Sequence, residues 1–140
     1  MDTEERSELG KRSRRAGKAF EVKVRKELES NGWIVARWTK KVEEGQLVDS
    51  KPKFNPYTRM AQSVSTGFPD FVVFIPNRTN VDYKFQVKLV ECKLRGKLDK
   101  EEKEQARVYN FLGFEVIVAS EYIDENGRKK IRFISTMADP

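Results

Sequence analysis

The sequence predicts an α/β fold in which helices flank a mixed central sheet and the elements follow the order αβββαβ, with a short strand at the end. Three observations predict it. Residues 17–30 repeat apolar side chains at helical spacing, residues 70–75 are apolar on both faces, and residues 83–93 alternate apolar and polar side chains as a half-buried strand does. A length of 140 residues suits a single domain, residues 1–140.

The first helix is expected over residues 17–30. Phe20, Val24 and Leu28 recur four residues apart and so lie on one face, and a Ser-Asn-Gly sequence ends the helix with turn chemistry. Residues 1–16 are polar and strongly basic and lack this apolar spacing. We therefore expect them to form a flexible N-terminal segment.

A strand follows the first helix, and an irregular segment follows the strand. Residues 33–38 are rich in Trp, Ile and Val and predict a strand. Residues 39–66 show no clear period and contain Pro52 and Pro56. We expect an insertion or long loop there, with a short helix near residues 57–63. A loop of this length in a small domain is more often functional than idle.

The second helix is predicted from its first turn. Asp99 has the character of an N-cap and Glu102 stands at the capping-box spacing, so the helix begins there and runs to about Leu112, before a glycine. Residues 114–120 predict the next strand, and an Asn-Gly turn leads to a last short strand.

The alternating pattern of residues 83–93 fails at its end. One face of that strand runs through Leu89 to Glu91 and Lys93, so two charges stand where apolar side chains are expected. The segment 70–75 begins with Asp70, directly after a proline. Because only a turn separates the two strands, we expect them to pair as a hairpin, which brings the three charged residues to one end of the sheet.

Composition narrows the chemistry. The net charge of +6 favours a polyanionic partner, above all nucleic acid. The absence of histidine excludes histidine zinc sites and Ser-His-Asp or Cys-His nucleophiles. One cysteine cannot form an intramolecular disulfide, and neither a membrane-length apolar run nor a signal peptide is evident. The chain is therefore predicted to be soluble and cytoplasmic, with no membrane partner.

The charged residues at the sheet end suit phosphodiester hydrolysis. Asp70 and Glu91 supply the oxygen ligands that Mg²⁺ prefers while leaving water positions for a substrate. The metal would activate a water molecule, and Lys93 would hold the charge that develops. The alternative is that Glu91 and Lys93 form only an ion pair at a strand end. Burial argues against that alternative, because a buried pair costs about as much as it returns.

These residues resemble the motif of the PD-(D/E)XK nuclease superfamily, with Pro69-Asp70 on one strand and Glu91-Cys92-Lys93 on the next. The resemblance implies the restriction-endonuclease-like fold, whose αβββαβ core would span residues 17 to about 120. It also implies a divalent cofactor, Mg²⁺ or Mn²⁺.

The resemblance further implies a role for each residue of the site. Asp70 and Glu91 would bind the metal together with the backbone carbonyl of Cys92, and Lys93 would orient or activate the hydrolytic water. Many members place a further acid on the first helix, and Glu21 fits that position as a catalytic residue and possible metal ligand. The alternative for Glu21 is a solvated helix face.

Two subfamilies compete. The first helix, the strand after it and the residues before Asp70 are similar to the archaeal Holliday junction resolvases, which implies phosphate contacts by Arg37 and Ser65 and a homodimer. The insertion 39–66 departs from that pattern and puts junction selectivity in doubt. On the second helix, Gln105 and Tyr109 match the Gln-x-x-x-Tyr element of RecB-type nucleases. Gln105 would then support catalysis or bind phosphate, and Tyr109 would contact nucleic acid or simply fill the core.

The leading interpretation is a Mg²⁺-dependent DNA endonuclease. The alternatives are a RecB-like exonuclease, a non-catalytic nucleic-acid-binding module and a protein-interaction domain. The DNA could be duplex, branched or single-stranded, and its backbone would be bound without sequence preference by basic side chains. The candidates for this contact are Lys11, Arg12, Arg14, Arg15 and Lys18, with Lys97 as a further example.

Overall fold

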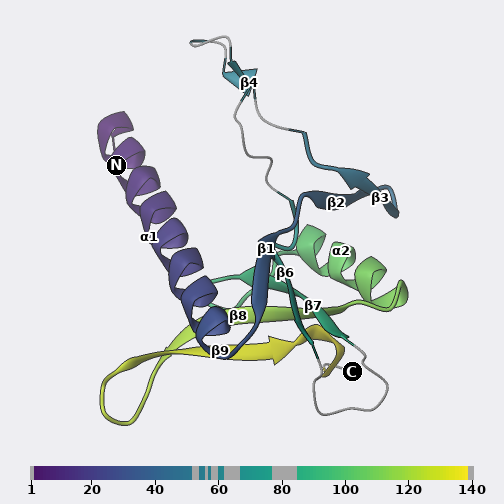
Figure 1. Ribbon diagram of the computed structural model, residues 1–140. Helices are drawn as coiled ribbons and strands as arrows, with labels where there is room; N and C mark the ends of the chain where they lie inside the picture. The colour runs from purple at the N-terminus through teal and green to yellow at the C-terminus, as the bar shows by residue number, and fades with distance from the viewer. Residues whose placement is uncertain are drawn as a thin grey trace.

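The computed structural model describes residues 2–51, 54–55, 57, 60–61, 67–76 and 85–138. A five-stranded mixed sheet with the order β1-β6-β7-β8-β9 forms the centre (Figure 1). Only β7 and β8 run parallel; the other neighbouring pairs are antiparallel. The predicted α/β class is thus confirmed. The strands are β1 (Ile34–Arg37), β6 (Phe71–Pro76), β7 (Phe85–Cys92), β8 (Glu115–Ile123) and β9 (Lys129–Ser135).

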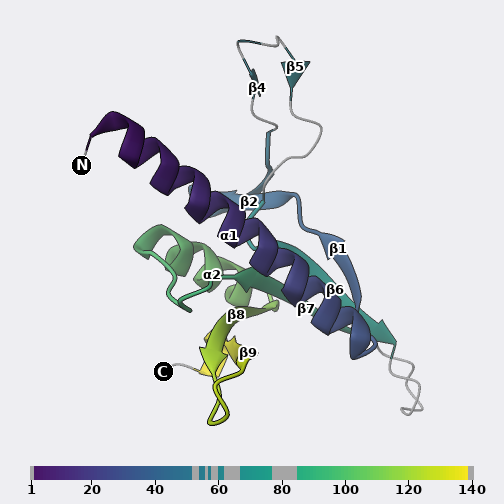
Figure 2. The same cartoon turned by 90° about the vertical axis from the view of Figure 1, so that its left-hand side faces the viewer.

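Two helices, α1 (Thr3–Ser30) and α2 (Lys100–Phe111), cover opposite faces of the sheet (Figures 1 and 2). The predicted apolar stripe of α1 is buried in a core cluster that includes Val90. The neighbouring residue of β7, Leu89, belongs instead to the cluster under α2, together with Tyr109. Successive residues of a strand point to opposite faces, so each helix packs on its own layer of side chains.

The first helix begins at Thr3 and not near residue 17, so the segment predicted to be flexible is helical over most of its length. Its first turn is closed by a capping box: the Asp2 side chain accepts a hydrogen bond from the Glu5 N–H, and the Glu5 side chain accepts one from the Asp2 N–H. Only Phe20, Val24 and Leu28 of this helix are buried. The N-terminal half extends past the sheet (Figure 1) and carries no apolar period that could have predicted it.

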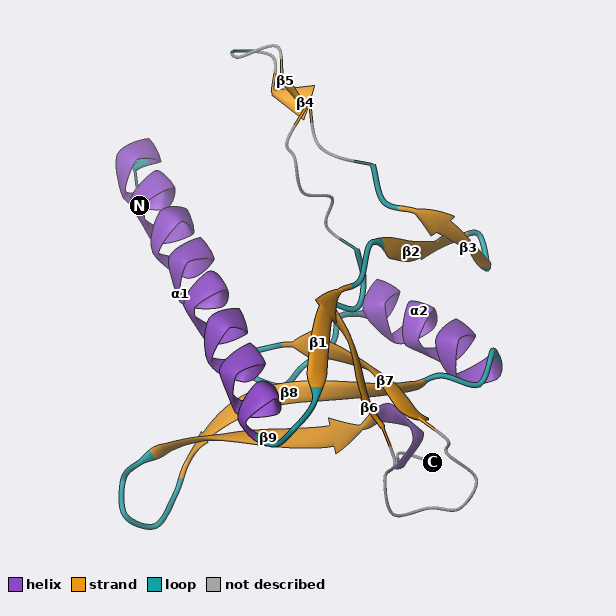
Figure 3. Cartoon of the chain, viewed as in Figure 1, coloured by secondary structure: helices purple, strands orange, loops and turns teal. Residues whose placement is uncertain are grey.

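The insertion contains two short antiparallel pairs rather than a helix (Figure 3). One is the hairpin of β2 (Lys40–Glu43) and β3 (Gln46–Asp49). The other pairs β4 (Phe54–Asn55) with β5 (Met60–Ala61). The short helix expected near residues 57–63 is therefore wrong at β5, where backbone groups pair across strands. A short isolated helix without an apolar face to pack gains too little to form.

The two ends of the insertion are fastened together beside Asp70. The Phe68 N–H donates to the Lys40 carbonyl at 2.9 Å, and the Trp38 N–H donates to the Asp70 carbonyl at 3.0 Å. A Cβ on Gly67 would lie 2.4 Å from the Trp38 carbonyl oxygen, so only glycine allows this close approach. The insertion thus begins and ends against the segment that carries the predicted site.

The predicted hairpin is confirmed. In the register of β6 and β7, Phe71 lies opposite Val90, so Asp70, one residue earlier, comes next to Glu91. The second helix also begins as predicted, with the Asp99–Glu102 capping box in place. A short 3-10 helix, η1 (Thr136–Ala138), ends the described chain. Within the described residues, no helix is long and apolar enough to cross a membrane.

Candidate active site

Asp70 lies directly before β6 and is held against the end of β7. Its Oδ2 accepts a hydrogen bond of 2.7 Å from the Cys92 N–H. The β6–β7 register brings the neighbouring Glu91 side chain to the same point. The two carboxylates that sequence reasoning placed together are therefore adjacent, and the hairpin register is the reason.

Glu91 is a buried carboxylate without a described partner for one of its oxygens. The residue is 5% exposed, on the same face as the fully buried Leu89, and its Oε1 accepts no hydrogen bond from the described part of the chain. Burial raises the pKa of Glu91 well above its usual value, and the charge of Asp70 and a side-chain hydrogen bond with it raise it further. A site that holds two carboxylates this closely needs a proton or a cation.

Lys93 supplies one cation, although it is shared. Its Nζ lies 3.5 Å from Oε2 of Glu91 and 2.6 Å from Oε2 of Glu102. Burial lowers the pKa of Lys93, but the hydrogen bond to Glu102 and the charges of Glu91 and Glu102 outweigh burial, so the pKa is raised. Lys93 is therefore a protonated side chain held between β7 and α2.

Sequence reasoning missed the role of Glu102 at this site. It was recognised only as the capping residue of α2, and its Oε1 does accept a hydrogen bond of 3.0 Å from the Asp99 N–H. The other oxygen, Oε2, binds Lys93. The capping box that starts α2 thus also holds the lysine. The available signal was an acid on the first turn of the helix that directly follows the Lys93 segment.

We expect Glu102→Gln to lower the pKa of Lys93, because glutamine removes the charge that stabilises the ammonium group. Glutamine at this position still completes a capping box, so α2 should keep its first turn. The stability loss should be about 1 kcal/mol, the size of one partly exposed charged contact. The pKa is measured by NMR of the Lys93 side-chain carbon next to Nζ.

Glu101→Gln is the matched control, since Glu101 lies in the same helical turn but is exposed. An unchanged Lys93 pKa in Glu102→Gln, or an equal shift in both variants, would contradict a specific hold by Glu102.

Glu21 of α1 interacts electrostatically with Asp70. Burial raises the pKa of Glu21, the charge of Asp70 raises it further, and the charges of Arg37 and Lys18 lower it. These influences mean that Asp70, Arg37 and Lys18 all lie within electrostatic reach of Glu21. Helix α1 therefore adds a third carboxylate and Lys18 to the surroundings of Asp70, and the end of β1 adds Arg37.

Gln105 and Tyr109 of α2 form hydrogen bonds to the insertion and to the segments on either side of it. The Gln105 side-chain oxygen accepts a hydrogen bond of 2.8 Å from the Val42 N–H, which ties the insertion hairpin to α2. Tyr109 is 0% exposed; its hydroxyl donates to the Phe68 carbonyl at 2.7 Å and accepts from the Trp38 indole at 3.0 Å. Of the two roles expected for Tyr109, the structure shows the filling of the core: its phenol is buried and bonded, and so is not exposed for a nucleic-acid contact.

The side chain of Cys92 packs in the core, and its backbone N–H contacts the candidate site. Its side chain packs against the cluster under α1, on the face away from Glu91. Burial raises the pKa of the Cys92 thiol, and the charges of Asp70, Glu21 and Glu91 raise it further, so the group stays a thiol. Its N–H holds Asp70, and a metal-ligand role for its carbonyl remains a prediction.

The predicted basic contacts lie mainly on one face of α1. Their residue numbers differ by three, four and seven, which places four of them along a single stripe. All are exposed, as is Arg37 at the end of β1. Ser65 lies outside the described residues. The stripe, called the basic stripe below, consists of Lys11, Arg14, Arg15 and Lys18, with Arg12 beside it.

Asp70 and Glu91 fit a Mg²⁺ ion that has few protein ligands and keeps several water ligands. In the described ranges, no three or more His, Cys, Asp and Glu side chains form a ready metal-binding group. Mg²⁺, however, is usually bound by one or two carboxylates and keeps several waters. Asp70 and Glu91 are such a pair. The buried Oε1 of Glu91, which has no hydrogen-bond partner among the described residues, is an acceptor that a cation would satisfy.

Comparison with known proteins gave no match: none of the protein-family models, curated proteins or solved structures searched is similar enough to this chain.

Proposed function

We propose that this protein is a metal-dependent deoxyribonuclease, an endonuclease that hydrolyses DNA phosphodiester bonds, built on a restriction-endonuclease-like αβββαβ core. One observation carries the proposal: the β6–β7 register joins Asp70 to a buried Glu91 whose Oε1 has no partner in the described structure, with Lys93 beside them. The strand directions of β1, β6, β7 and β8 are compatible with that core.

Each residue has a task in this reaction. Asp70 and Glu91, with the Cys92 carbonyl, would hold the metal. Bound Mg²⁺ or Mn²⁺ supplies the Lewis acid that polarises the phosphoryl group and lowers the pKa of the attacking water. Lys93, kept protonated by Glu91 and Glu102, stabilises the negative charge that develops on the phosphoryl oxygens. Glu21 is a further acid that can position a water on the α1 side of Asp70.

DNA would approach along α1. The basic stripe runs down one helix face and ends at Lys18, three residues before Glu21, so its spacing leads from the exposed helix end to the site. Its side chains would neutralise backbone phosphates of duplex, branched or single-stranded DNA without reading bases. Arg37, within reach of Glu21, would contact a phosphate close to the metal.

Two subclasses of nuclease use different residues of this chain. The Holliday-junction-resolvase-like reading would make the protein a homodimer, because a four-way junction offers two symmetric cuts. The RecB-like exonuclease reading depends on Gln105 and Tyr109. Gln105 is bonded to the insertion hairpin and Tyr109 is buried, so these two side chains lend that reading no support beyond their spacing.

The proposal is tested by incubating the protein with labelled linear duplex, single strand, flap and four-way junction DNA in Mg²⁺, Mn²⁺ or EDTA. We expect cleavage with either metal and none in EDTA. A covalently closed circular substrate, which has no ends, separates endonuclease from exonuclease. A non-catalytic binding module would bind DNA equally with and without EDTA and cut none of the substrates, and that result would refute the proposed function.

A further inference from the structure

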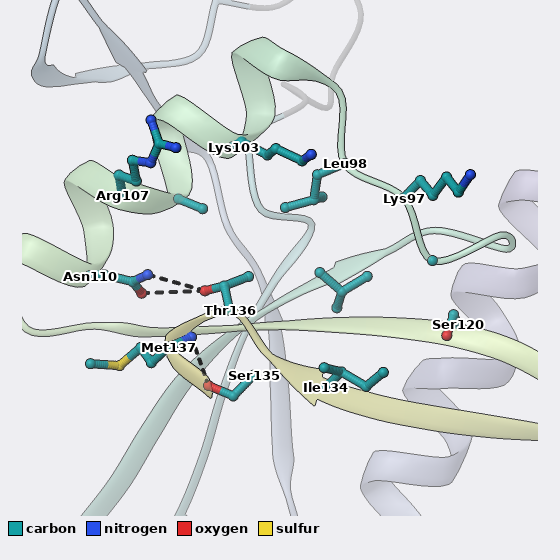
Figure 4. Close-up of a pocket in the computed structure, with 13 residues that line it drawn as sticks. Lys97, Leu98, Lys103, Arg107, Asn110, Ser120, Ile134, Ser135, Thr136 and Met137 are labelled. Carbon is teal, nitrogen blue, oxygen red and sulfur yellow. Dashed lines mark hydrogen bonds between the residues drawn. The ribbon is translucent and has the colours of Figure 1, made fainter. Parts of the chain in front are cut away.

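A groove of about 960 Å³ lies between α2 and the paired strands β8 and β9 (Figure 4). Figure 4 shows Lys103 and Arg107 on the α2 side, and Ile134 and Ser135 on the β9 side. One end is closed where the Asn110 amide nitrogen donates to the Thr136 hydroxyl at 3.2 Å. The groove lies on the sheet face that also carries Glu91 and Lys93.

The other end of the groove begins directly beyond Lys93. The Gly96 N–H donates to the Lys93 carbonyl at 2.8 Å, and residues 96–98 then form the groove wall. Gly96 has a φ of 73°, and a Cβ there would lie 3.2 Å from the Ser120 Cβ. This turn therefore keeps the wall close to β8 and makes the groove continuous in the chain with the candidate active site.

The groove combines unpaired cations with uncovered apolar surface. Lys97 and Lys103 are exposed at its rim, and neither forms an ion pair with a described residue. Arg107 is paired with Glu104, so it contributes less charge. None of the described lining residues is acidic. Ile134 and Met137 are 51% and 57% exposed, although they line a concave surface.

We infer that this groove binds unpaired nucleotides of the DNA strand that extends from the active site. A single strand has phosphates that can pair with Lys97 and Lys103. Its unstacked bases have apolar faces that can cover Ile134 and Met137 and remove their apolar surface from water. A duplex is a poorer occupant, because its base faces are stacked inside and cannot reach a concave apolar floor. This inference rests on the proposed function and names its substrate as DNA with a single-stranded segment.

The test measures binding in EDTA, where no cleavage enters, by fluorescence anisotropy of a labelled oligothymidylate. The double variant Lys97→Gln/Lys103→Gln should bind about 20-fold more weakly at about 0.1 M salt and reduce the salt slope by about 1.4, the loss of two single-strand phosphate contacts. The control Lys26→Gln/Lys130→Gln removes the same charge from exposed positions elsewhere and should bind nearly as the unchanged protein does. Ile134→Gln should weaken binding without changing the salt slope.

The duplex of equal length decides the substrate class. We expect the groove variants to lose less affinity for duplex than for the single strand. Equal losses for both DNAs, or equal weakening by the control pair, would overturn the inference. Either result leaves the metal-dependent cleavage assay untouched, so failure of the groove and failure of the proposed function are separate outcomes.

Discussion

Lys93→Ala and Asp70→Asn are each expected to reduce Mg²⁺-dependent DNA cleavage by about a thousandfold or more, while DNA binding in EDTA changes little. Lys93 is the cation nearest the two carboxylates, and removing one preorganised charge from such a site typically costs two to three orders of magnitude. Asp70→Asn removes the ligand charge but keeps an oxygen that can accept the Cys92 N–H. Single-turnover cleavage rates at saturating DNA measure the effect.

Lys88→Ala is the matched control for Lys93→Ala. Lys88 lies on β7, the strand that Lys93 directly follows, and also forms an ion pair, with its Nζ 3.2 Å from Oε2 of Glu115. It lies away from the end of β7 that carries the site. It should retain near-normal cleavage. Cleavage that survives in both Lys93→Ala and Asp70→Asn would exclude this site as the catalytic centre.

The second large effect is a change in the stability of the protein with pH, which a bound metal ion should offset. Burial, with the charge of Asp70, raises the pKa of Glu91 from 4.5 to about 10. The folded protein therefore keeps a proton that the unfolded chain releases. The contribution of Glu91 to the free energy of unfolding should be fully present below about pH 4.5 and should be lost as the pH rises toward about 10, so the protein should lose stability relative to Glu91→Gln over this range. Denaturant unfolding in EDTA across this range measures the trend.

Mg²⁺ or Mn²⁺ should reverse this loss, because the metal takes the place of the proton between Asp70 and Glu91. The stabilisation should be about 2.7 kcal/mol at a free metal concentration one hundred times the Kd. At one fixed metal concentration it should be larger at pH 8 than at pH 6, because binding displaces a proton and the Kd therefore falls as the pH rises. It is measurable without any DNA. Glu91→Gln, which never ionises, should flatten the pH dependence and abolish the metal effect.

Glu115→Gln provides the control for Glu91→Gln, since Glu115 is a half-buried strand carboxylate outside the site. It should keep both the pH trend and the metal response. A Glu91→Gln protein that is still stabilised by Mg²⁺ would place the metal elsewhere.

Sequence patterns of a few residues predicted the features of the fold that depend on residues close together in the chain. The apolar stripe of Phe20, Val24 and Leu28 is buried as expected, because helical spacing alone sets a helix face. The Asp99–Glu102 capping box starts α2, and the β6–β7 pairing follows from two strand patterns near each other in the chain. The meeting of Asp70 and Glu91 depends only on that pairing, so it too could be predicted.

Other features depend on contacts between distant segments. The early start of α1 rests on a cap and on exposed polar turns, which resemble a flexible segment in sequence. Gln105 meets Val42, and Tyr109 meets Trp38 and Phe68, across long stretches of chain. The spacing of a Gln and a Tyr four residues apart is the same whether the two side chains form long-range structural hydrogen bonds or contact a substrate, so the sequence could not distinguish these roles.

The sequence by itself identified the residues of the candidate site: Asp70 directly before one strand, and Glu91 and Lys93 where the pattern of the next strand breaks. It could do so because strand alternation has a period of two and a charge on a core face stands out. Only the tertiary structure decided the surroundings of these charges. It paired Lys93 with Glu102 on α2, brought Glu21 toward Asp70 from the other face, and left one oxygen of Glu91 buried without a described partner. The physical reason is that burial and charge pairing depend on how the two helices pack across the sheet, which no local pattern encodes.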